Sequence, residues 1–228
     1  MRWADLDQLD HVNNVVYVDY ATEALAAHAE AGELELAEPR HLRVDYLRPL
    51  LLSRTPVEVT TEAAADGTTV QDIRPAGAEV AFARVTSSPR APVLDPVAPG
   101  GVPFAVRVRR SDLGPDGAVC ATKLFEIGQE SRIVSVERLR EAGDIGGIGA
   151  FVVARVDVLP AAPVRWRSEP YTARTRVLEV GRKSFTLTTS LEDGELGRID
   201  AVLVGFDLEQ QRSRELTDRE REALEAQR

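Results

Sequence analysis

The chain has 228 residues, of which 43% are hydrophobic, and a formal net charge of −9 at pH 7. This composition is typical of a globular protein, and the acidic charge excludes a general surface for nucleic acid or anionic membranes. The single cysteine, Cys120, excludes a disulfide framework and a thiolate metal cluster, and it is expected to be a small buried residue. No apolar run reaches the roughly 18 residues of a membrane span, and the N-terminus lacks an export signal. A cytoplasmic protein is therefore expected.

The first feature in chain order is a polar loop directly ahead of a helix. It carries three carboxylates, one imidazole and two amides, at Asp5, Asp7, Asp10, His11, Asn13 and Asn14. A helix that begins near the asparagines leaves its first N–H groups without intrahelical partners, and its N-terminus attracts negative charge. Such an end can stabilise the oxyanion of an acyl-transfer intermediate. The sequence thus places a reactive carboxylate beside an oxyanion site.

Several residues of this loop also have ordinary structural interpretations. Asp5 and Asp10 are typical turn and capping residues, because Asp readily accepts hydrogen bonds from nearby backbone N–H groups. Either asparagine is expected as the N-cap of the helix. His11 alone would be an ordinary buried, hydrogen-bonded histidine. Only the joint spacing of Asp7 and His11 favours a catalytic pair.

The first half continues with one helix and four strands. The helix is expected over residues 15–32, where one apolar and one polar face can be drawn. Strands are expected over residues 40–47, 55–63, 68–74 and 79–87. Asp66-Gly67 predicts a hairpin turn, because glycine adopts positive φ without steric cost.

A proline-rich segment over residues 89–103 predicts a stiff, extended linker. The second half then repeats the same order of elements. It begins with a strand over 104–110, a loop through 112–117 and a helix over 119–142. The expected strands that follow span residues 150–159, 171–180, 184–192 and 198–208. The charged tail, 213–228, is predicted to be a solvated terminal helix.

Short sequence matches support a repeat of one unit. Arg43–Leu47 reads RVDYL and Arg155–Leu159 reads RVDVL, while Asp5-Leu6 matches Asp112-Leu113. A strand, a long helix and four antiparallel strands form an α+β pattern, in which the helix packs on one sheet face. The predicted domains are residues 1–88 and 104–212.

The loop carries a family resemblance. Its pattern, Asp5-Leu6-Asp7, three further residues, His11-Val12-Asn13-Asn14 and then Tyr17, resembles the signature of hot-dog-fold thioesterases. The similarity is to the 4-hydroxybenzoyl-CoA thioesterase-like and acyl-acyl-carrier-protein thioesterase branches. It implies two tandem hot-dog domains, each an antiparallel sheet wrapped around a long helix, paired within one chain. The carrier-protein branch has an asparagine where this chain has Leu9.

The two halves differ in chemistry. The offset from Asp5 to Asp112 is 107 positions (112 − 5), and at this offset the acid at Asp7, the imidazole and both amides have no counterpart in the second half. At this offset Asp7 meets Gly114, His11 meets Ala118, and Asn13 and Asn14 meet Cys120 and Ala121. The second domain is therefore predicted to be degenerate. It would serve as a structural partner in a single active site at the interface of the two halves.

The resemblance implies an acyl-CoA thioesterase that hydrolyses an acyl thioester to a free acid and a thiol. The implied catalytic residues are Asp7 and His11. The oxyanion would bind at the helix N-terminus, to the N–H groups of Asn13, Asn14 and Val15. Tyr17 would contact the substrate. Asp7 either attacks the thioester carbonyl directly or removes a proton from an attacking water. An acidic chain disfavours an acidic carrier protein as acyl donor, which favours coenzyme A esters.

No metal or redox cofactor is expected, because His28 and His41 lie in no ligand-like spacing. Coenzyme A would enter only as part of the substrate, with a basic rim for its phosphates drawn from Arg48, Arg84, Arg90, Arg107, Arg109 and Arg110. The expected partner is thus a small acyl thioester, with neither nucleic acid nor membrane. Further association of the chain into a homodimer is compatible with the family.

Two other functions remain open. One is an acyl-acyl-carrier-protein thioesterase, which uses the same chemistry on a protein-bound substrate. The other is a non-catalytic acyl-CoA-binding or sensing module that kept the fold and lost turnover. Replacement of Asp7 distinguishes them, because only an enzyme has turnover to lose.

Overall fold

The computed structural model describes residues 1–7, 10–95, 100–142, 145 and 150–228. The chain divides into two compact units, Met1–Val93 and Leu94–Arg228. The division lies inside the proline-rich segment that was predicted as a linker. The glycine-rich stretch 143–149 is outside the described residues except for Ile145.

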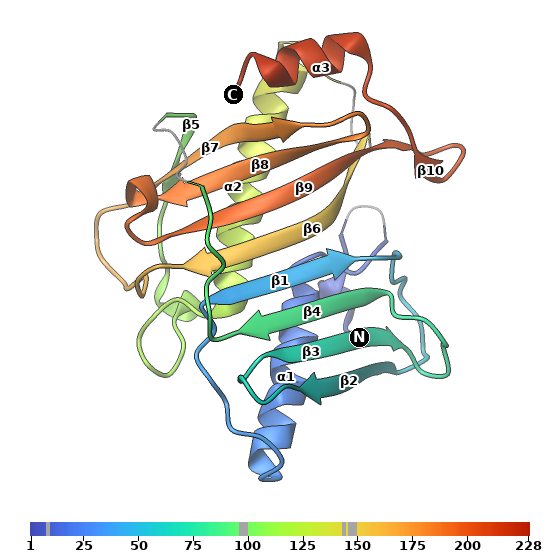
Figure 1. Cartoon of the computed structure of the whole chain (residues 1–228), viewed down its shortest axis with the longest axis vertical. Coiled ribbons are helices and arrows are strands. Elements are labelled where there is room, and N and C mark those ends of the chain that lie inside the picture. The colour runs from blue at the N-terminus through green and yellow to red at the C-terminus, as the bar shows by residue number, and fades with distance from the viewer. Residues whose placement is uncertain (8–9, 96–99, 143–144, 146–149) are drawn as a thin grey trace. The chain divides into compact units, whose positions relative to one another are not determined.

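The described part of the first unit is an antiparallel sheet with one helix on one face (Figure 1). Helix α1 spans Val16–Glu30 and packs on β2, β3 and β4. The strand order is β2-β3-β4-β1. The strands are β1 (His41–Tyr46), β2 (Val57–Ala63), β3 (Thr69–Pro75) and β4 (Ala83–Ser88).

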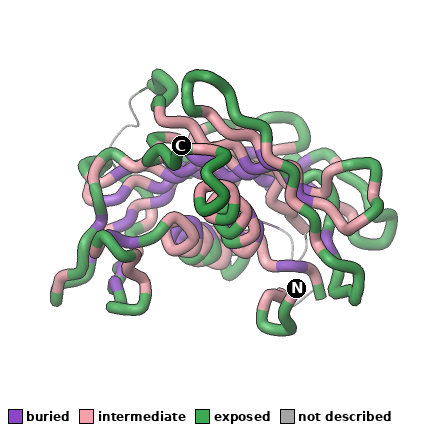
Figure 2. Tube along the Cα trace, turned by 90° about the horizontal axis from the view of Figure 1, so that it is seen from below, coloured by how far each residue is buried: buried purple, intermediate pink, exposed green. Residues whose placement is uncertain are grey.

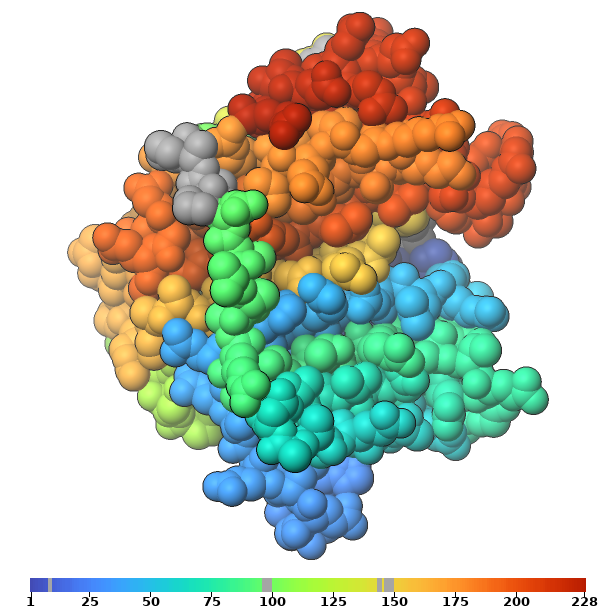
Figure 3. Space-filling model, viewed as in Figure 1, coloured from blue at the N-terminus to red at the C-terminus, as the bar shows by residue number. Residues whose placement is uncertain are grey.

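Alternation of apolar and polar residues explains why this sheet is buried on one side only. On β1 the side chains of Leu42 and Val44 are buried, and on β4 those of Ala83 and Val85 are buried. The residues between them face outward, as expected for a strand with a period of two. In Figure 3 the residues of these strands lie on the face of the unit that is turned to the viewer.

The described part of the second unit has the same plan with an added edge strand. Helix α2 (Ala121–Glu141) packs on the sheet, whose strand order is β6-β9-β8-β7-β5. The short strand β10 pairs with β9, and helix α3 packs against β7. The bounds are β5 (Val102–Val106), β6 (Phe151–Pro160), β7 (Tyr171–Val180), β8 (Ser184–Leu191), β9 (Gly197–Asp207), β10 (Arg212–Ser213) and α3 (Asp218–Glu225).

The described residues also form single-turn 3₁₀ helices, η1 (Trp3–Asp5), η2 (Arg110–Asp112) and η3 (Glu192–Gly194). The buried side chains of each unit gather between its helix and its sheet, whereas the connecting loops are exposed (Figure 2). At Gly128 the helix α2 comes very close to β9. A Cβ placed there would lie 2.6 Å from Cγ2 of Ile199.

Three sequence expectations need correction. The strand expected over 104–110 begins at Val102, inside the predicted linker, and ends at Val106, because Arg110 opens η2. The tail over 213–228 is not a solvated helix: Leu224 of α3 is fully buried and Glu220 is only 4% exposed. Cys120, expected as a small buried residue, is exposed.

Candidate active site

The polar loop of the first unit is closed by backbone hydrogen bonds around Asp7 and His11. The N–H of Asp7 donates to the carbonyl of His11 at 2.8 Å. The N–H of His11 donates to Oδ1 of Asp7 at 3.1 Å. Between them, Asp10 adopts φ +58°, a left-handed conformation that allows the chain to reverse. Both Asp7 and His11 are half-buried, and the neighbouring Leu9 lies outside the described residues.

Asp5 holds the start of the loop in the manner expected of a capping residue. Its carboxylate accepts the N–H of Arg2 at 2.6 Å and the hydroxyl of Tyr20 at 3.1 Å. Its carbonyl accepts the N–H of Asn13 at 2.7 Å. Burial, and then the negative charge of Asp5, raise the pKa of Tyr20. Asp5 therefore has a structural role in holding the loop together.

The helix begins later than predicted, which changes the role of the asparagines. Val15 is the N-cap residue of α1, so neither Asn13 nor Asn14 caps it. Instead Oδ1 of Asn13 accepts the N–H of Val15 at 3.3 Å, and the Asn13 carbonyl accepts the N–H of Val16 at 3.0 Å. The helix starts here because Val15 already has helical backbone angles, φ −74° and ψ −26°.

These contacts distinguish the three backbone N–H groups that the sequence suggested for an oxyanion. The N–H of Asn13 donates to Asp5, and that of Val15 donates to Asn13. No hydrogen bond of the Asn14 N–H to another described residue is seen. A further hydrogen bond holds the backbone of Asn14 in place, because its carbonyl accepts the hydroxyl of Tyr46 at 2.8 Å. Of the three N–H groups, that of Asn14 is therefore the one best placed to donate to a ligand.

Tyr17 lies in an aromatic cluster beneath the loop and is only 3% exposed. Its ring packs edge-to-face on Tyr20 and Tyr46, with centroid distances of 6.4 and 5.5 Å. Burial raises the pKa of Tyr17 to about 12; the charge of Asp7 adds to this, and a hydrogen bond with the Leu50 backbone partly offsets it. The roles of Tyr20 and Tyr46 could not be predicted from the sequence, because no local pattern links them to their distant partners.

The loop of the second unit has the same backbone arrangement without the chemistry. Gly114 N–H donates to Ala118 at 2.7 Å, and Cys120 N–H donates to Asp112 at 3.1 Å. The Asp112 carboxylate accepts the N–H of Arg109 at 2.7 Å, and Gly117 adopts φ +76°. Each of these features has its counterpart in the first unit 107 positions earlier. At that offset Gly114 and Ala118 replace Asp7 and His11, so this loop contains neither the acid nor the imidazole.

The arginines suggested for a phosphate rim have diverse surroundings. Arg84 forms a bidentate pair with Asp72, at 2.7 and 2.9 Å, and Arg90 lies 3.7 Å from Asp66. In the second unit, Arg107 and Arg109 line a cavity of about 650 Å³ together with Lys123, Arg167 and Trp166. Among the described residues no group of three or more His, Cys, Asp or Glu side chains is arranged to hold a metal ion.

Comparison with solved structures defines the class of fold. A putative oleoyl thioesterase from Lactobacillus plantarum superposes with a TM-score of 0.68 at 15% identity, over 91% of this chain and 94% of that one. The 12:0-ACP thioesterase from Umbellularia californica gives 0.66 at 12% identity, over 90% and 92%. An acyl-ACP thioesterase from Bacteroides thetaiotaomicron gives 0.59 at 12% identity, over 89% and 94%. The chain therefore has the hot-dog fold of thioesterases, as predicted.

The sequence comparison is more specific at the N-terminus. Residues 1–82 match the family model described as the acyl-ACP thioesterase C-terminal domain. No curated protein matches the chain. The resemblance inferred from the signature, to thioesterases of the hot-dog and acyl-ACP thioesterase type, is thus confirmed. Among the helices that the structure describes, none is both long and apolar enough to cross a membrane.

Proposed function

We propose that the protein hydrolyses acyl thioesters and that Asp7 is the reacting carboxylate. The observation that carries this proposal is the loop in which Asp7 and His11 are bound to each other's backbone, just ahead of α1. The equivalent loop of the second unit keeps the backbone bonds and lacks both side chains. The backbone arrangement therefore does not require these two residues, which favours a chemical role for them.

The chemistry follows from the positions of the polar groups. Asp7 either attacks the thioester carbon, with departure of the thiolate and later hydrolysis of the acyl-enzyme anhydride, or removes a proton from an attacking water. His11 orients the water or the substrate carbonyl. The N–H of Asn14 and the N-terminus of α1 stabilise the oxyanion, at about 3 kcal/mol for each well-placed donor. This proposal involves no metal or redox cofactor.

We favour coenzyme A esters as the acyl donors. The net charge of −9 disfavours approach of an acidic carrier protein, because like charges slow association and weaken it. A carrier-protein thioester is the second candidate, and the description of the matching family model favours it. A non-catalytic acyl-CoA-binding module is the third, since the second unit shows that the loop persists without its reactive groups.

The test is release of free thiol from acyl-CoAs and from the same acyl groups on carrier protein, for short, long and aromatic chains. The wild type is compared with Asp7→Asn, whose amide oxygen can still accept the N–H of His11. Asp10→Asn is the matched control, because it removes a carboxylate from the same loop and asparagine tolerates the left-handed conformation.

Turnover that falls at least about 100-fold in Asp7→Asn and persists in Asp10→Asn supports the proposal. Unchanged turnover in Asp7→Asn would show that the reacting group lies elsewhere. Absence of turnover with every substrate, together with thermal stabilisation by an acyl-CoA, would favour the binding module.

A further inference from the structure

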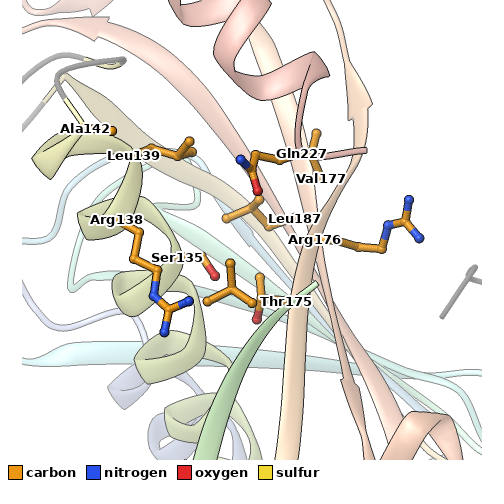
Figure 4. Close-up of a pocket in the computed structure, with 10 residues that line it drawn as sticks. Ser135, Arg138, Leu139, Ala142, Thr175, Arg176, Val177, Leu187 and Gln227 are labelled. Carbon is orange, nitrogen blue, oxygen red and sulfur yellow. The ribbon is translucent and has the colours of Figure 1, made fainter. Parts of the chain in front are cut away.

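The second unit contains a pocket between α2 and its sheet, lined by residues of β5, β7 and β8. Figure 4 shows it between the C-terminal half of α2 and strands β7 and β8. Its volume is about 270 Å³, and its lining includes Ser135, Leu139, Thr175, Val177 and Leu187. The pocket belongs to the unit whose loop lacks the reactive groups, so its function is not explained by the proposed chemistry at Asp7.

The two ends of this pocket differ in character. Leu139, Val177 and Leu187 are buried and give one end a mainly apolar lining, which Figure 4 shows interrupted by the side-chain amide of Gln227. At the other end, Figure 4 shows the Ser135 hydroxyl directed from α2 toward the strands and the Arg138 guanidinium beside it. Arg176 also borders the pocket, but its guanidinium points away from it. The pocket is therefore amphipathic, with polar groups from α2 and from Gln227.

Ser135 provides an unused polar group at this end. The residue is 6% exposed, and its hydroxyl oxygen has no hydrogen-bond partner among the described residues. Thr175, on the facing strand, bonds Thr189 at 2.8 Å and is satisfied. Buried polar groups in native proteins are nearly always paired, so an unpaired hydroxyl at a pocket wall points to a missing ligand.

Arg138 adds a positive charge next to this hydroxyl. It follows Ser135 by three residues, so the two side chains lie on the same face of α2. Arg138 forms no ion pair with another residue that the structure describes. Arg140, by contrast, pairs with Glu137 at 2.7 Å. A hydroxyl donor and a cation side by side are suited to an anionic oxygen.

The volume limits the size of the ligand. At about 30 Å³ for each water-sized group, 270 Å³ holds on the order of nine non-hydrogen atoms. A carboxylate head with a chain of about six to eight carbon atoms has this size.

We propose that this pocket binds a short aliphatic carboxylate, with its head on Ser135 and Arg138 and its chain against Leu139, Val177 and Leu187. Such an acid would be a product of the proposed thioesterase, but the binding site does not depend on that activity. The same head-and-chain chemistry could be offered by a free acid or by the acyl part of a thioester. Only the free acid carries the charge that Arg138 would recognise.

The experiment is calorimetric titration of the full chain carrying Asp7→Asn, so that turnover cannot interfere. The ligands are hexanoate and octanoate, with octanol and octanoyl-N-acetylcysteamine as uncharged arms. We expect saturable binding of octanoate, at least tenfold weaker binding of both uncharged ligands, and competition between hexanoate and octanoate.

The variants locate the head group. Arg138→Gln is expected to weaken octanoate binding at least tenfold, and Ser135→Ala several-fold, whereas the matched control Arg140→Gln leaves it unchanged. Thermal unfolding of each variant checks that it folds. Because both positions border the pocket, the ¹³C shift of carboxyl-labelled octanoate gives a second readout, which should move in Arg138→Gln.

Three results would overturn this inference. The first is the absence of saturable binding of either acid. The second is equal binding of octanol and octanoate. The third is octanoate affinity that is the same in Arg138→Gln, Ser135→Ala and Arg140→Gln. Tighter binding of the thioester, independent of Arg138, would assign the pocket to an uncharged acyl chain.

Discussion

The backbone N–H of His11 donates to Oδ1 of Asp7 at 3.1 Å, and the backbone N–H of Asp7 donates to the carbonyl of His11 at 2.8 Å. The two bonds hold the Asp7 carboxylate against the backbone of His11. The imidazole of His11 takes no part in either bond. The second unit has the equivalent bond, from the N–H of Gly114 to the carbonyl of Ala118 at 2.7 Å, with no acid or imidazole present. The side chain of His11 can therefore be changed without loss of the loop.

Replacement of His11 by alanine is expected to reduce kcat by roughly 100-fold, because loss of the group that orients the water or the substrate carbonyl misplaces the reacting atoms. The melting temperature should change little, since the loop uses only the backbone of His11. Thiol-release kinetics and thermal unfolding check the two statements. His28→Ala, in the last turn of α1, is the control and should keep full turnover. Equal losses of activity in both variants would contradict a specific role for His11.

The left-handed backbone at Asp10 predicts that glycine is tolerated better than valine at this position. Its φ is +58°, and the equivalent residue of the second unit is Gly117, with φ +76°. Asp10→Gly should therefore leave the free energy of unfolding nearly unchanged, whereas Asp10→Val should lower it by about 1–2 kcal/mol, because a β-branched side chain crowds the backbone there. Urea unfolding of the two variants measures this difference. If valine were tolerated as well as glycine, the loop could not have this conformation in solution.

Gly128→Ala should have two opposing effects on the free energy of unfolding. Alanine improves helix propensity by about 1 kcal/mol, but its Cβ would lie 2.6 Å from Cγ2 of Ile199. Overpacking of a core costs about 1–3 kcal/mol, so we expect net destabilisation of about 1 kcal/mol. Chemical unfolding measures it. Ile199→Ala should partly rescue Gly128→Ala, which is tested by a double-mutant cycle; an additive result would show that the two residues do not touch.

The ion pair of α3 predicts a pH-dependent stability. Burial alone would raise the pKa of Glu220, but hydrogen bonds from Arg214, at 2.7 and 2.8 Å, outweigh it and leave the pKa lowered from 4.5. A lowered pKa in the folded state contributes stability above the unfolded value, and this is lost as the pH falls through the folded value. Glu220→Gln should therefore destabilise the protein by about 1.5–3 kcal/mol at pH 7.

The difference between wild type and Glu220→Gln should shrink below about pH 4.5, where the glutamate is protonated in the unfolded chain. Unfolding curves between pH 3.5 and 8 measure it. Glu222→Gln, at an exposed position of α3, is the control and should have little effect at any pH. A difference that stays constant down to the lowest pH would show that the charge of Glu220 is not what stabilises the helix.

Sequence periodicity predicted most of the fold. The strands at 40–47, 171–180, 184–192 and 198–208 appear within about two residues as β1, β7, β8 and β9. Local alternation suffices for these strands because each has one buried and one open face. The 107-position offset also holds in the structure, because the hydrogen bonds of both loops join residues only a few positions apart.

The candidate site was predictable only in part. The positions of Asp7 and His11 in one tight turn follow from their spacing. The N-cap at Val15 does not, since the side chain of Asn13 bonds one residue ahead of the helix instead of capping it. Tyr46 lies 32 residues from its partner, Asn14, and no local pattern reports such a contact.

By itself, the sequence determined the signature, the order of elements and the loss of the acid and imidazole from the second half, because all three are carried by local spacing and composition. Tertiary structure alone decided that the Asn14 N–H has no partner among the described residues, that the charged tail docks through Leu224, and that α2 and β7 enclose an amphipathic pocket. These features depend on side chains that meet from distant parts of the chain. Burial and hydrogen-bond pairing, rather than local propensity, determine their energies.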